Sequence, residues 1–199
     1  MNIIQSEKQY QAFILDKLKN ENGFVIRKAA SFDRYFAIDR ELLFGFLNDT
    51  QPKTMEQLSK IYKDKLEDTI ISYINTETTK KRGSLLEVLK HGIELSNQKL
   101  ELMYTKPATT FNKELNELYE KNVFSVMEEV WASDDERIDL VVFLNGLAIM
   151  SFELKCNFAG QSVDDAIYQY RVDRNPKTRL FLFKSGTLVN FAMDQMKYI

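Results

Sequence analysis

The chain has 199 residues, a formal net charge of −2 and 44% hydrophobic residues, enough for a single globular domain with its own core. This charge excludes the strongly basic composition of an autonomous DNA-binding domain. No apolar stretch approaches the ~20 residues that span a bilayer, and the N-terminus lacks the basic and apolar regions of a signal peptide. The one cysteine, Cys156, excludes an internal disulfide, so we expect a cytoplasmic protein with no membrane segment.

The first half of the chain is predicted to be helical. Apolar residues recur there at intervals of three and four, which is typical of amphipathic helices. The predicted helices cover residues 6–18, 40–47, 58–73 and 87–91. Ser6 is a suitable N-cap for the first helix, Pro52 separates the second from the long third one, and Gly92 closes the last.

The second half of the chain is predicted to form a sheet. The predicted strands cover residues 99–104, 123–131, 140–144, 147–152, 180–183 and 188–191. Helices are expected between them over residues 112–121 and 161–170. Asn145-Gly146 lies between two apolar strands, which is a strong indication of a tight β-hairpin.

Three charged residues lie near the open end of this hairpin: Asp139, Glu153 and Lys155. Residues two apart on a strand share a face, so Glu153 and Lys155 point the same way. Alone, this pair would indicate only a weak surface ion pair at a strand end. Asp139 on the neighbouring strand adds a second carboxylate, and two close carboxylates repel each other unless a cation lies between them. Oxygen ligands without histidine or thiolate suit Mg²⁺ or Mn²⁺, and a lysine beside such a metal can orient a water molecule.

This hypothesis makes a demand on the hairpin register. With a regular two-residue Asn145-Gly146 loop, Asp139 would lie opposite Phe152 and would point away from Glu153. We therefore expect a three-residue loop with Gly146 in a G1 bulge, or an equivalent bulge elsewhere in the hairpin. Either bulge would allow both carboxylates to reach one ion.

Other motifs contribute little. The chain has no G-x-x-x-x-G-K-[ST] loop, no G-x-G-x-x-G and no C-x-x-C. His91 is expected to be structural, and Cys156 to be a small packed thiol. Two basic patches, Lys80-Lys81-Arg82 and residues 171–179, are compatible either with a solvated surface or with phosphate contacts. The basic residues of the second patch are Arg171, Arg174, Lys177 and Arg179.

Several segments together resemble the N-terminal nuclease domain of the restriction (R) subunit of type I restriction-modification enzymes. The clearest are "RIDLVVFLNGLAIMSFELK", "GQSVDDAIYQYRVDRNP" and "LFLF", and weaker similarity extends through "TQPKT", "KRGSLLEVLKHGIEL" and "YEKNVFSVMEEV". The resemblance implies a PD-(D/E)XK fold of the α/β (α+β) class, with a mixed central sheet flanked by helices and a helical N-terminal half. It also implies that residues 1–199 form one nuclease domain.

The resemblance assigns roles to individual residues. Asp139 and Glu153 would hold Mg²⁺, with Mn²⁺ as a substitute, and Lys155 would position the attacking water. Gln169 matches the glutamine of the family's Q-x-x-x-Y motif and completes the expected catalytic set.

The chain also departs from that motif. The position of the motif tyrosine is occupied by Asp173, although Tyr170 is adjacent to Gln169. Some nucleases of this wider fold use a glutamate from the first helix, and Glu7 is the candidate here.

The implied function is cleavage of double-stranded DNA after ATP-driven translocation. ATP would be bound only by motor domains that this chain does not contain, so we expect an N-terminal fragment of a longer protein. The implied partners are DNA and the methyltransferase (M) and specificity (S) subunits. Two alternatives are a stand-alone PD-(D/E)XK repair or junction nuclease and a non-catalytic docking module of the same fold. Walker motifs further along the native chain would favour the restriction subunit over the first alternative.

Overall fold

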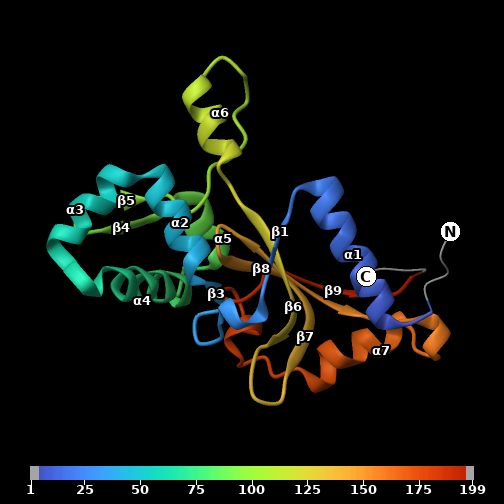
Figure 1. Cartoon of the computed structure of the whole chain (residues 1–199). Helices are drawn as coiled ribbons and strands as arrows, with labels where there is room; N and C mark the ends of the chain where they lie inside the picture. The colour runs from blue at the N-terminus through green and yellow to red at the C-terminus, as the bar shows by residue number, and fades with distance from the viewer. Residues whose placement is uncertain (1–4, 196–199) are drawn as a thin grey trace.

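The computed structural model describes residues 5–195 as a mixed sheet with helices on both faces and a helical lobe at one side (Figure 1). The strands follow the order β1-β6-β7-β8-β3-β2, and β9 also pairs with β8. They are β1 (Val25–Arg27), β2 (Phe32–Asp33), β3 (Ile38–Asp39), β6 (Phe124–Trp131), β7 (Arg137–Leu144), β8 (Leu147–Leu154) and β9 (Val189–Met193). The β1–β6 and β8–β9 pairs are parallel, and the remaining pairs are antiparallel. The expected mixed α/β fold is confirmed.

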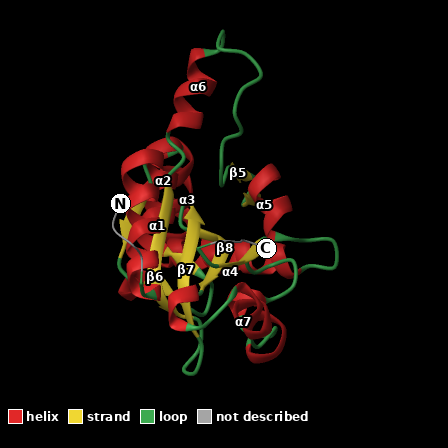
Figure 2. Cartoon of the chain, turned by 90° about the vertical axis from the view of Figure 1, so that its right-hand side faces the viewer, coloured by secondary structure: helices red, strands yellow, loops and turns green. Residues whose placement is uncertain are grey.

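The described helices are α1 (Glu7–Asn22), α2 (Arg40–Thr50), α3 (Pro52–Tyr62), α4 (Leu66–Thr79), α5 (Leu85–His91), α6 (Lys113–Glu120) and α7 (Val163–Tyr168). Five of the described helices, α1, α2, α5, α6 and α7, lie where the sequence predicts them, with ends that differ by up to four residues. Ser6 caps α1 by accepting a hydrogen bond from the Gln9 N–H, and Gly23 ends it at φ +71°. In both views α6 extends away from the rest of the chain (Figures 1 and 2). Within residues 5–195, no helix combines the length and the apolar character that crossing a membrane requires.

The single long helix expected over residues 58–73 is wrong. The chain forms α3 and α4 instead, joined by a 3₁₀ turn over Lys63–Lys65, with Lys63 at φ +52°. Leu58 on α3 and Ile70 on α4 are both fully buried in one core. Because the apolar spacing continues across the break, it could not reveal that the chain reverses to bury both helices.

Two strand predictions also need correction. The strand expected over 99–104 is the shorter β5 (Gln98–Leu100), which pairs with an unpredicted strand, β4 (Ile93–Leu95). The strand expected over 180–183 is instead a 3₁₀ turn over Arg179–Phe181, and its Leu180 packs into the core. Apolar runs this short do not distinguish a strand from a buried turn.

Alternating residues of the hairpin strands pack against different layers. One face packs against α1 and the helical lobe, and its buried strand residues include Val126, Leu140, Val142, Leu144 and Leu154. The other face packs against Leu180 and against α7, and its buried strand residues include Met127, Val141, Phe143, Ala148 and Ala192. Val130 and Ile138, which pair near the far end of β6 and β7, belong to the same cluster. Asp139 alternates with Val141 and therefore belongs to this second face.

The hairpin turn has two residues and not the three expected. Leu144 pairs directly with Leu147. Asn145 and Gly146 both have positive φ, +51° and +82°, as a type I′ turn requires. The predicted G1 bulge at Gly146 is therefore wrong.

The alternative expectation, a bulge elsewhere in the hairpin, is confirmed. Across it the paired residues are Phe143 with Ala148, Val142 with Met150 and Leu140 with Phe152. Ile149 is the extra residue of β8 and has no opposite position on β7. The register beyond the bulge places Asp139 across from Glu153, so both carboxylates lie on one face of the sheet.

The tight turn gives a stability prediction for Gly146. A Cβ at this position would lie 2.4 Å from the Asp39 carbonyl oxygen and 2.6 Å from the Leu43 nitrogen, in a backbone conformation that L-residues rarely adopt. Gly146→Ala should lower the free energy of unfolding by about 2–4 kcal/mol in urea denaturation.

Gly45→Ala is the matched control, because a Cβ at Gly45 in α2 meets nothing within 4 Å. It should change the free energy of unfolding by no more than about 1 kcal/mol, and towards higher stability. Equal effects of the two alanines would contradict this account of the turn.

Candidate active site

Asp139 on β7 and Glu153 on β8 form a buried carboxylate pair. Their exposed fractions are 8% and 1%. The Leu154 N–H donates a hydrogen bond of 2.7 Å to Asp139 Oδ2, which fixes Asp139 across the hairpin. The structure therefore brings these two predicted residues together.

Lys155 lies beside this pair, immediately after β8. Its N–H donates to the Met193 carbonyl oxygen at 2.8 Å, which continues the pairing of β8 with β9. Its side chain is buried, and Nζ lies 3.6 Å from Glu7 Oε2. Glu7 is the first residue of α1, so the structure also places this predicted glutamate at the site.

The surroundings of the pair raise the pKa of both carboxyl groups. Burial raises the pKa of Asp139 above its ordinary value, and the charge of Glu7 adds to this effect. Burial, followed by the charge of Asp139, raises the pKa of Glu153 to about 7. Two buried carboxylates whose pKa values are raised in this way would be stabilised in their ionised form by a cation bound between them.

Gln169 lies where α7 passes into a π-helical turn, Gln169–Asp173. Its Oε1 is buried and, among the residues that the structure describes, has no hydrogen-bond partner. An acceptor in this state is unusual and costly, and π-turns occur often at functional sites. Within the described residues no hydrogen bond joins Gln169 Oε1 to Asp139, Glu153 or Lys155, so its catalytic role stays a prediction.

The π-helical turn directs Tyr170 toward the site. The Tyr170 hydroxyl lies 2.8 Å from Ser151 Oγ, two residues before Glu153 on the same face of β8. Burial raises the pKa of Tyr170 far above its usual range. Asp173, at the position of the motif tyrosine, is exposed.

Sequence reasoning missed the role of Arg174. Its guanidinium forms an ion pair with Glu153 Oε1 and donates a hydrogen bond of 2.9 Å to the Arg137 carbonyl oxygen. The patch over residues 171–179 is therefore not a single surface, because Arg171 is exposed while Arg179 donates to the Ser185 carbonyl oxygen. Charge balance was the available indication, since two buried carboxylates and one lysine call for a further cation.

The donor set fits a hard divalent cation. Mg²⁺ typically takes one or two carboxylates and completes its coordination with water and substrate phosphate oxygens, and Asp139 with Glu153 supply such a pair. Within the described part of the chain, no cluster of three or more histidine, cysteine, aspartate or glutamate residues is arranged to hold a metal. Cys156 is buried and accepts a hydrogen bond from Gln195 Nε2.

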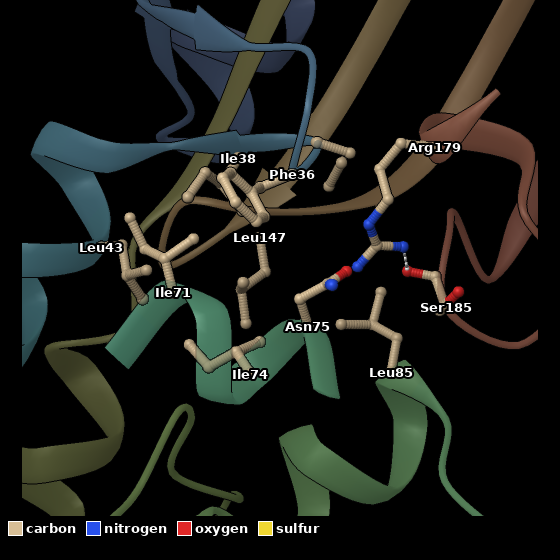
Figure 3. A pocket seen from close by; sticks show the side chains of 12 residues that line it. Phe36, Ile38, Leu43, Ile71, Ile74, Asn75, Leu85, Leu147, Arg179 and Ser185 are labelled. Carbon is tan, nitrogen blue, oxygen red and sulfur yellow. Dashed lines mark hydrogen bonds between the residues drawn. The ribbon is translucent and has the colours of Figure 1, made fainter. Parts of the chain in front are cut away.

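A small cavity between α4, α5 and the start of β8 is separate from this site (Figure 3). Its volume of about 10 Å³ has room for one water molecule. Arg179 and Ser185 lie at one side of it, and most of the remaining lining is apolar. It is too small for a nucleotide.

The raised pKa of Glu153 predicts how stability depends on pH without a metal. The folded chain keeps a proton on Glu153 up to about pH 7, whereas the unfolded chain loses it near its ordinary pKa of 4.5. Between these values the folded state binds more protons, so the free energy of unfolding should fall as the pH rises.

Glu153→Gln cannot ionise and should lose part of this pH dependence. Urea denaturation in EDTA, from about pH 4.5 to pH 7, should show the variant gaining stability relative to the unchanged chain. Glu117→Gln, at an exposed position on α6, should follow the unchanged chain. Parallel curves for the two variants would contradict the raised pKa.

The sequence of residues 4–198 matches the family model described as the type I restriction enzyme R protein N terminus. The comparison with curated proteins gives no match. The matched range contains the hairpin, α7 and the four predicted catalytic residues, and the mixed sheet flanked by helices is consistent with a nuclease-like fold. Because the match covers nearly the whole sequence, the chain belongs to the family of type I restriction enzyme R protein N-terminal domains.

Proposed function

We propose that this chain is a Mg²⁺-dependent endonuclease domain that cleaves the phosphodiester bonds of double-stranded DNA. One observation carries the proposal: the bulge at Ile149 places Asp139 and Glu153 on the same face, with Lys155 two residues beyond Glu153. The family supplies the context, since the chain belongs with the N-terminal domains of type I restriction enzyme R proteins.

Asp139 and Glu153 would hold the Mg²⁺ ion through carboxylate oxygens. When bound, the ion supplies Lewis-acid stabilisation of the charge that develops on the phosphate oxygens. Lys155 would orient the attacking water and stabilise this negative charge, because its ammonium group lies beside the pair in a site largely shielded from water. Water attacks the phosphorus atom and loses a proton, the bond to one ester oxygen breaks, and a phosphate monoester and a hydroxyl group are left.

Gln169 would position the DNA or a neighbouring side chain. Its buried Oε1 lacks a partner among the described residues, so it can accept a hydrogen bond from a bound group without breaking an existing one. Tyr170, held to Ser151, would form part of the wall beside the carboxylates.

The charge of the chain favours action within a larger complex. A net charge of −2 provides little attraction to a polyanion, because non-specific DNA affinity comes mainly from phosphate neutralisation. Motor domains that hydrolyse ATP, together with the M and S subunits, would deliver DNA to the site in the cytoplasm and raise its local concentration.

Substitutions at the site test the chemistry in the assembled enzyme. Asp139→Asn, Glu153→Gln and Lys155→Met should each lower the rate of plasmid cleavage by about 100-fold or more, while ATP hydrolysis continues. Gln169→Ala should cost less, about tenfold, because it removes a positioning contact and not a metal ligand. Asp135→Asn, exposed four residues before Asp139, is the control and should cleave normally. Undiminished cleavage by Lys155→Met would exclude the assignment.

DNA binding by the isolated chain tests the dependence on a complex. Titration with a DNA duplex in Mg²⁺ at physiological salt should give a Kd weaker than about 1 µM and little cleavage. Tight binding with efficient cleavage would favour the stand-alone nuclease.

A further inference from the structure

We propose that Arg174 is a positioning residue whose guanidinium stays paired with the Glu153 carboxylate until a divalent cation displaces it. The inference rests on the proposed function, because it concerns the same carboxylate pair. Metal binding at this pair is therefore an exchange of one cation for another and not a simple addition.

The contacts of Arg174 support a competition for the same oxygen atoms. The guanidinium forms an ion pair with Glu153 Oε1, which is one of the two oxygens that Glu153 could offer to a metal. The side chains of Arg174 and Glu153 are only 10% and 1% exposed, so little solvent screens the pair. A metal ion close to Glu153 would lie beside a second positive charge at short range, which is strongly unfavourable in such surroundings.

The count of charges leads to the same conclusion. The described groups that interact with the pair are Asp139, Glu153, Glu7, Lys155 and Arg174. Their three carboxylates and two cations leave one unbalanced negative charge. A divalent cation would over-compensate this charge if Arg174 remained, whereas the group would be neutral if Arg174 left.

The backbone around Arg174 holds the guanidinium in place. Its N–H donates to the Gln169 carbonyl oxygen at 2.9 Å, at the end of the π-helical turn. The next residues are anchored to buried Glu136, which accepts hydrogen bonds from the Asn175 N–H and, at 2.6 Å, from the Thr178 hydroxyl. The segment thus runs from α7 back to the connection before β7. These anchors place the Arg174 side chain beside Glu153.

Arg174 also retains an unused donor. Its Nε is buried and has no hydrogen-bond partner among the described residues, so its present position does not satisfy the whole guanidinium. Arginine binds phosphate through two parallel N–H groups. After the exchange, the Arg174 side chain could pair with a phosphate oxygen of the bound DNA, and its positive charge would remain compensated.

The affinity of the 199-residue chain for Mn²⁺ tests the exchange without requiring catalysis. Isothermal titration should show that Arg174→Met binds Mn²⁺ about fivefold or more tightly than the unchanged chain. In EDTA the same variant should have a lower Tm, and Mn²⁺ should restore the loss. Arg171→Met, exposed on the π-helical turn that precedes Arg174, is the matched control and should bind Mn²⁺ like the unchanged chain.

Arg174→Gln serves if the methionine variant fails to fold. It keeps a polar amide group but has no charge, and it should also bind Mn²⁺ more tightly. Equal or weaker binding by the folded Arg174 variant would overturn the inference, and if Asp139→Asn still abolished binding the proposed metal site would stand. Absence of Mn²⁺ binding in both the unchanged chain and the variant would overturn the metal site and the inference together.

Discussion

Strand alternation is the constraint on which the candidate site depends. Successive side chains of a strand point to opposite faces, so the two-residue turn at Asn145-Gly146 alone would separate Asp139 from Glu153. One extra residue in β8, Ile149, reverses the alternation for the rest of the strand. The same shift leaves Leu147 and Leu154 in one core and turns Glu153 toward α7. Site and core thus follow from one local irregularity, and removing it would require burying charge among leucines.

Once both carboxylates share a face, the surrounding elements have to compensate their charge. Lys155 from the end of β8 and Arg174 from the segment after the π-helical turn supply positive charge, whereas Glu7 from the first turn of α1 adds a negative charge that lies beside Lys155. Three segments distant in sequence therefore meet at one end of the hairpin. Burial makes each of these charges matter more than it would at the surface, because water screens them little. Loss of any one of these charged side chains therefore changes the charge balance of the whole site.

The family assignment and the geometry support each other through different residues. Similarity to type I restriction enzyme R proteins extends over residues 4–198 and concerns the chain as a whole. The geometry concerns a few side chains, of which Arg174 lies outside the motif and Tyr170 is one position past its glutamine. A docking module without catalytic function would gain nothing from a buried carboxylate pair, which costs stability unless a cation compensates it. Under the nuclease proposal, the bound Mg²⁺ ion compensates the charge of this pair.

The sequence by itself determined the features that depend on neighbouring residues. Ser6 and Gly23 delimit α1, Asn145-Gly146 closes the hairpin, and spacing places Glu153 and Lys155 on one face, because caps, turns and alternation are local. The alternation of side chains along the two strands required a bulge if the carboxylates were to share a face. It did not indicate the position of the bulge, because no feature of the sequence marks Ile149. Only the tertiary structure decided the parallel pairing of β9, the break at Lys63 and the approach of Arg174 to Glu153. These arise from packing and charge compensation between distant segments, for which spacing along the chain carries no information.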